Sequence, residues 1–114
     1  MRKITQLAVK KFLNHENFKM GNTDVWSGYE CSLTRITRLS LHGNDIATKV
    51  YDTIKIDNQG WFSNTTKERL NGLLHSLGRI GIQQKNYKWY LDGKEWNGEE
   101  VELLKNNEWK YTHP

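Results

Sequence analysis

Histidine and cysteine are the residues of this chain that most readily hold a metal ion or act as nucleophiles. The chain has four histidines, at His15, His42, His75 and His113. None has a partner at the spacing of a zinc site, so we expect no bound metal. Cys31 is the single cysteine and alternates with Tyr29 and Leu33. That pattern favours a buried, unreactive thiol over a nucleophile.

The short motifs of common enzyme classes are also missing from the sequence. It contains no G-x-S-x-G turn, no glycine-rich phosphate loop and no paired-carboxylate motif. We therefore expect no catalytic residue and no cofactor, and we predict that the protein is not an enzyme.

The strongest candidate for contact chemistry is Asn64–Lys67, where a helix is predicted to start. Thr65 and Glu68 have the T-x-x-E spacing of a capping box, in which each side chain accepts a hydrogen bond from the other's backbone N–H. A helix start also attracts phosphate or carboxylate, and Lys67 and Arg69 add positive charge nearby. Both interpretations stay open, and capping is favoured because the cap itself occupies the free N–H groups.

A second candidate is Gln84–Tyr90, in which basic and aromatic residues interleave. Strand alternation would place Lys88 and Tyr90 on one face, and Tyr87 and Trp89 on the other. One face could then stack on bases or on a partner's side chains, while the other packs inward. Core packing is the favoured interpretation of Trp89, because aromatic strand residues usually fill cores.

Two helices are predicted to position these groups. Apolar spacing indicates the first over roughly Lys3 to Asn14, and the second begins at Thr66. Gly72, inside the second helix, indicates a close backbone contact, and Gly78 is placed to end the helix in a left-handed conformation. The buried face of the second helix is predicted to consist of Leu70, Leu73, Leu74 and Leu77.

The remaining chain has the pattern of antiparallel strands and short turns. Asn14–Asn22 is predicted to be a connector and Ser27-Gly28 a turn, and the loss of alternation near Arg35 indicates a bulge or an inserted loop. Trp61-Phe62 is expected to enter the core. Strands are predicted over Ile46–Val50 and Thr53–Ile56. Turns are predicted at Gly43-Asn44, Lys85-Asn86 and Asp92-Gly93.

These elements predict an α+β fold, with the two helices packed on a twisted antiparallel sheet or meander. A length of 114 residues suits one hydrophobic core, so we expect a single domain over residues 1–114. Five Trp, five Tyr and three Phe supply large side chains for that core. The single cysteine fits a reducing cytosol, and no apolar run is long enough for a membrane span.

Three segments, taken in order, resemble a widespread class of small tailed-bacteriophage proteins. They read SLHGNDIATK, GWFSNTTKERLNGL and QQKNYKWYLDGKEWNG, and they follow the opening KITQLAVKKFLN. The resemblance spans most of the chain and implies a phage product in the cytoplasm of the host cell, without catalytic residues to carry over. Two stretches look longer than in this class, Tyr29–Arg38 and Glu99–Pro114, and such loops often set partner specificity.

The favoured function is a non-enzymatic phage accessory protein that binds and modulates a host macromolecular machine, with inhibition as the favoured mode. That machine would be a nucleic-acid-handling or defence complex, so the expected partner is a host protein or nucleoprotein complex. The alternative is a DNA- or RNA-binding regulatory protein, which a net charge of +4 mildly favours. The predicted partner-binding residues are Lys10, Lys11, Lys67, Arg69, Lys85, Lys88 and Tyr90.

Overall fold

The structure is a computed structural model, and it describes residues 1–31 and 33–113. Within these residues the chain forms two helices, α1 (Lys3–Leu13) and α2 (Asn64–Ser76), and ten short strands. The strands are β1 (Phe18–Met20), β2 (Thr23–Cys31), β3 (Thr34–Leu41), β4 (Asn44–Val50), β5 (Thr53–Ile56), β6 (Ile82–Lys85), β7 (Lys88–Leu91), β8 (Lys94–Trp96), β9 (Val101–Leu103) and β10 (Trp109–Tyr111).

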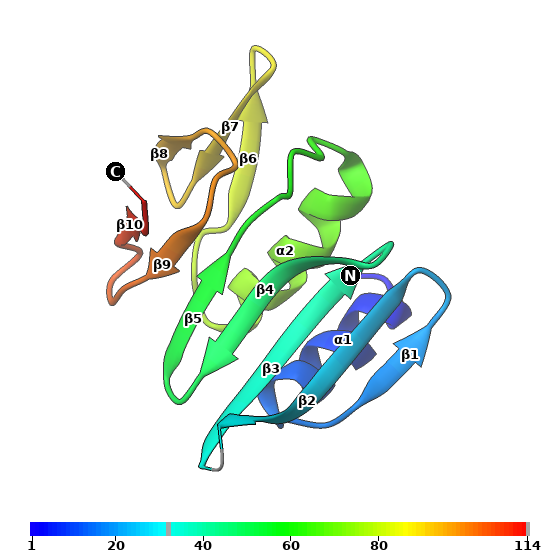
Figure 1. The fold of residues 1–114 in the computed structure, drawn as a ribbon. Helices are drawn as coiled ribbons and strands as arrows, with labels where there is room; N and C mark the ends of the chain where they lie inside the picture. The colour runs from blue at the N-terminus through cyan, green and yellow to red at the C-terminus, as the bar shows by residue number, and fades with distance from the viewer. Residues whose placement is uncertain (32, 114) are drawn as a thin grey trace.

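The strands form two antiparallel sheets (Figure 1). The larger sheet has seven strands in the order β1-β2-β3-β4-β5-β9-β10, and the smaller has three in the order β6-β7-β8. After β5 the chain leaves the large sheet, forms α2 and the small sheet, and returns as β9 beside β5. The predicted α+β class is therefore confirmed.

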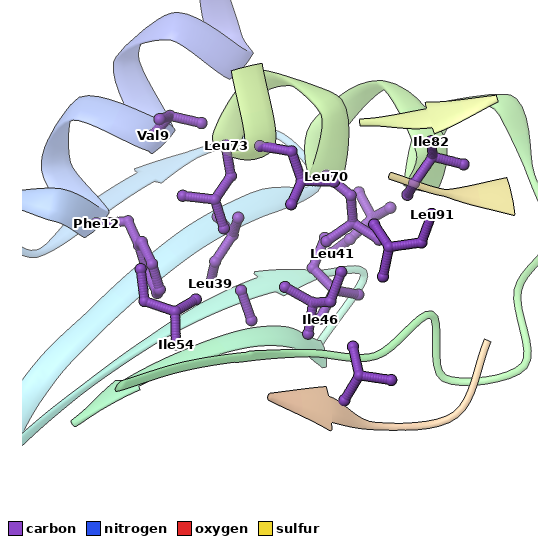
Figure 2. Close-up of a cluster of buried hydrophobic side chains, with 14 of the residues drawn as sticks. Val9, Phe12, Leu39, Leu41, Ile46, Ile54, Leu70, Leu73, Ile82 and Leu91 are labelled. Carbon is purple, nitrogen blue, oxygen red and sulfur yellow. The ribbon is translucent and has the colours of Figure 1, made fainter. Parts of the chain in front are cut away.

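Both helices cover the same face of the large sheet, and Figure 2 shows the side chains that meet between them. Phe12 of α1 and Leu73 of α2 are fully buried and point toward Leu39 on the sheet. The same buried cluster continues through Leu91 of the small sheet. One apolar core thus joins the two sheets and fixes α2 between them.

The two helices approach each other closely at Gly72, as its position inside the second helix predicted. A Cβ built on Gly72 would collide with the side-chain methyl group of Thr5 in α1. Glycine lowers the stability of an isolated helix, but here it lets α2 lie against α1. Gly78 also has its predicted role, with a φ of +77° and its N–H donating to the His75 carbonyl at 3.0 Å.

Several local predictions on the strands were wrong. The connector predicted at Asn14–Asn22 contains β1, and Ser27-Gly28 lies inside the continuous strand β2. The indole of Trp26 lies over Gly28, where a Cβ would be 2.6 Å from Trp26 Cζ2. An aromatic ring that covers a strand glycine in this way compensates for its missing side chain, which is why no turn forms there.

Of the two alternatives predicted for the break in alternation near Arg35, a bulge and an inserted loop, the structure shows the bulge. Arg35 lies within β3, and the register of the β2–β3 ladder shifts between Tyr29 and Cys31. The interruption is therefore a bulge at the end of a hairpin. The predicted burial of the Cys31 thiol lies outside the described side chains.

Leu77, predicted on the buried face of α2, is exposed because it is the C-terminal cap residue, beyond the last helical turn. The hairpin turn predicted at Lys85-Asn86 lies one residue later, at Asn86-Tyr87. The strands predicted over Ile46–Val50 and Thr53–Ile56 and the turn at Asp92-Gly93 are confirmed.

Candidate functional site

The residues predicted to contact a partner do not form one face. Lys10 and Lys11 lie at the C-terminal end of α1, whereas Lys85 and Lys88 lie on the β6–β7 hairpin, at the opposite end of the molecule (Figure 1). Tyr90 lies on the same face of the small sheet as these two hairpin lysines, since it pairs with Gln83 two residues before Lys85.

Lys67 contacts the other face of the hairpin. Its Nζ donates to Gln84 Oε1 at 2.8 Å and lies 6.0 Å from the centre of the Trp89 ring. Trp89 itself is buried, as the favoured interpretation of the sequence held. Lys67 therefore ties α2 to the small sheet.

Arg69 is only 1% exposed, so its charge is not presented at the surface. Its Nε donates to Thr23 Oγ1 at 2.9 Å, and its Nη1 donates to Thr5 Oγ1 at 3.0 Å and to the Glu68 carboxylate. These contacts join α2 to α1 and to the start of β2. A buried guanidinium with such partners serves the fold, because removing a partner would leave a buried charge unpaired.

Glu68 completes this buried network instead of the capping box that we predicted. Burial alone would raise the pKa of its carboxyl, but hydrogen bonds from Thr5, from the Arg2 N–H and from Arg69, with the Arg69 charge, outweigh burial and lower it. The carboxylate is thus stabilised in its charged form.

Ser63 is the true N-cap of α2, which begins at Asn64 and not at Thr66. Its Oγ accepts a hydrogen bond from the Thr66 N–H at 3.1 Å. The predicted Thr65 cap was wrong because a serine two positions earlier offers the same hydroxyl to the same turn, and Glu68 is already engaged by α1.

Ahead of that cap, Trp61 and Phe62 lie on the surface, with 61% and 54% of their area exposed. The prediction that they enter the core was wrong. A tight turn holds them outward: Asn58 Oδ1 accepts the Gly60 N–H at 2.8 Å, and the Asn58 carbonyl accepts the Trp61 N–H at 2.9 Å. Asn58 is itself buried, so the turn is anchored.

Trp61 borders a groove of about 460 Å³ between the β3–β4 turn and the start of α2. The groove has mostly apolar walls and is within the size range of small-molecule and side-chain pockets. On the other side of the same turn, the Phe62 ring meets Trp89 edge to face, with ring centres 5.0 Å apart. The groove is lined by Leu41, His42, Asn44, Ile46, Trp61, Ser63, Thr65 and Thr66.

The described residues contain no group of three or more His, Cys, Asp or Glu side chains that could hold a metal ion. Among the helices of that part of the chain, none is long and apolar enough to cross a membrane. What the surface does present is the exposed side chain of Trp61 beside a groove, on a segment that hydrogen bonds hold in place.

The sequence model of the Kyanoviridae Gp96 protein family matches residues 1–111. The chain belongs to this family. It is therefore a phage protein, which confirms the coarser part of the resemblance seen in the sequence. Searches of curated proteins and of solved structures found no match.

Three aromatic residues that sequence reasoning placed on the inward face, Trp61, Phe62 and Tyr87, are exposed in the structure. The signal for Trp61 and Phe62 was their place between Gly60 and the capping serine, since segments that connect a strand to a helix lie on the surface. The signal for Tyr87 was the hairpin itself. When Lys85 pairs with Lys88, Tyr87 falls in the two-residue turn between them and no longer follows the strand alternation that would turn it inward.

Proposed function

We propose that this member of the family is a non-enzymatic phage accessory protein that binds a host macromolecular machine, such as a nucleic-acid-handling or defence complex, and inhibits it. It acts by occupying a surface in the cytoplasm of the infected cell. The observation that carries this proposal is the exposed side chain of Trp61 beside the groove that it lines.

Large aromatic side chains dominate the binding energy of protein interfaces when their backbone is held in place. Trp61 meets this condition, because a hydrogen-bonded turn precedes it and the Ser63 cap follows it. A flexible loop would lose more entropy on binding than this anchored segment does. The proposed interface therefore has Trp61 at its centre.

The chemistry of the groove favours a protein partner over the phosphates of a nucleic acid. Its floor includes the buried side chains of Leu41 and Ile46, and the residues that line it include no lysine or arginine. Such a groove suits an apolar side chain of a partner. Direct binding of DNA or RNA, through a surface other than this groove, stays the alternative function of the protein.

Affinity capture from infected host lysate, with and without nuclease, tests this proposal. The tagged wild-type protein should retain its partner after nuclease treatment, and Trp61→Ala should lower the captured amount about tenfold or more, as expected for an interface hot spot. A partner that is lost on nuclease treatment would instead support the nucleic-acid alternative.

Tyr29→Ala is the matched control, because Tyr29 is 62% exposed and Trp61 is 61% exposed. Tyr29 also lies in the Tyr29–Arg38 segment, one of the two stretches whose extra length was expected to set partner specificity. Capture should be unchanged in this variant. If Tyr29→Ala loses the partner and Trp61→Ala keeps it, the interface lies on the β2–β3 hairpin and the proposed surface is wrong.

A further inference from the structure

The tip of the β6–β7 hairpin combines features that lower the stability of the fold. Asn86 and Tyr87 form its two-residue turn with φ values of 53° and 67°. Glycine is preferred at the second position of such a turn, because a side chain is strained in the left-handed region. Tyr87 is 96% exposed, so almost none of its ring packs against the protein to offset that strain.

The two residues that flank the turn are both lysines. Lys85 and Lys88 are direct cross-strand partners, and like charges placed opposite each other destabilise a strand pair. Lys88 Nζ lies 3.7 Å from Glu95 Oε1, but both side chains are well exposed. Surface ion pairs of this kind contribute little to the stability of a fold. The positive charge at the tip is therefore left largely uncompensated.

Lys85, Tyr87 and Lys88 are all exposed. The hairpin projects beyond the rest of the molecule, with its turn at the far end (Figure 1). Lys85, Lys88 and Tyr90 share the open face of the small sheet, whereas Trp89 packs inward on the opposite face. A strained aromatic residue and two opposed lysines at one projecting tip indicate a contact made outside the chain.

We propose that this hairpin tip binds single-stranded nucleic acid, with the Tyr87 ring stacked on an unpaired base and Lys85 and Lys88 bound to neighbouring phosphates. This is a second site, distinct from the Trp61 groove, and it goes beyond the proposed function.

Single-stranded nucleic acid explains both features of the tip, whereas an acidic protein surface explains only one. Carboxylates would pair with the lysines, but the face of an aromatic ring is electron-rich and repels them. Bases stack on such a face whatever their sequence. A duplex would satisfy the lysines but holds its bases stacked inside, where Tyr87 cannot reach them.

The test is fluorescence anisotropy with a labelled oligothymidine of about 20 nucleotides, a length that exceeds common site sizes. Tyr87→Gly should weaken binding about tenfold through the lost stacking, while its unfolding temperature rises because the strain is relieved. Tyr51→Gly is the matched control, since Tyr51 is 67% exposed and lies in another turn with a φ of 53°. It should gain stability without losing affinity.

The charge arm of the test compares two double variants with equal loss of charge. Lys85→Gln with Lys88→Gln should weaken binding and reduce its dependence on salt. Two phosphate contacts would make the affinity of the wild-type protein fall roughly sevenfold between about 50 and about 200 mM salt, and the double variant should lose most of that fall. Lys10→Gln with Lys11→Gln, at the other end of the molecule, should leave binding unchanged.

Equal losses in the two lysine pairs, or in Tyr87→Gly and Tyr51→Gly, would overturn the proposed site. So would wild-type protein that binds polyglutamate or a duplex as tightly as it binds the oligothymidine, or that binds none of the three at low salt.

Discussion

Trp61 shows how a single residue can be misread when its neighbours are ignored. A tryptophan between a strand and an amphipathic helix reads as a core residue, yet the Asn58 turn directs it outward. Its truncation should therefore change stability little. We expect Trp61→Ala to alter the free energy of unfolding by about 0.5 kcal/mol or less, the usual range for surface positions.

Urea denaturation of Trp61→Ala measures this directly, and Trp89→Ala serves as the comparison because Trp89 is buried. The Trp89 variant should lose about 3 to 5 kcal/mol, as large core truncations do. A comparable loss in Trp61→Ala would show that the indole packs inward after all, and the proposed interface would lose its central residue.

At the scale of the element, α2 was predicted well except at its start. The leucine spacing gave the buried face at Leu70, Leu73 and Leu74, and Gly78 gave the end of the helix. The start was misplaced because three successive hydroxyl or amide residues precede Thr66, and local spacing alone does not say which one caps. The contact of Glu68 with α1 leaves its carboxylate engaged outside a capping box, and that contact joins residues far apart in sequence.

Ser63→Ala should lower the free energy of unfolding by about 1 kcal/mol through loss of the cap. Thr65→Ala is the control and should leave it almost unchanged, because the Thr65 hydroxyl is not the cap. Thermal or chemical denaturation of the two variants shows which residue caps the helix. The reverse order of stabilities would restore Thr65 as the capping residue.

At the scale of the whole molecule, the two helices and the β4–β5 and β7–β8 hairpins could be predicted because each depends on neighbouring residues. The division into two sheets could not, since it depends on β9 returning to pair with β5. The burial of Arg69 was missed for the same reason: its partners Thr5 and Thr23 come from distant parts of the chain. Lys10 and Lys11 were grouped with the hairpin lysines because the sequence does not say where the first helix lies relative to the hairpin.

The Glu68 network joins α1, α2 and β2, so it should make the stability of the whole fold depend on pH. The pKa of Glu68 is lowered in the folded protein from its ordinary value of 4.5. The unfolded chain therefore binds the proton first as the pH falls, so the stabilisation is present above about pH 4.5 and is lost below it.

Glu68→Gln should remove this dependence. The difference in unfolding free energy between wild type and Glu68→Gln should shrink as the pH falls from about 6 to about 3. Denaturant titrations across that range measure it. A difference that stays constant with pH would mean that the Glu68 charge does not contribute to folding.

The most direct measurement of the central claim is site-specific photo-crosslinking in infected cells. A photo-reactive amino acid in place of Trp61 should give a crosslinked product with one host protein that survives nuclease, whereas the same amino acid in place of Tyr29 should not. Equal products from both positions, or a product at Trp61 that nuclease removes, would contradict the account of this family member as a protein that docks on a host machine through its Trp61 surface.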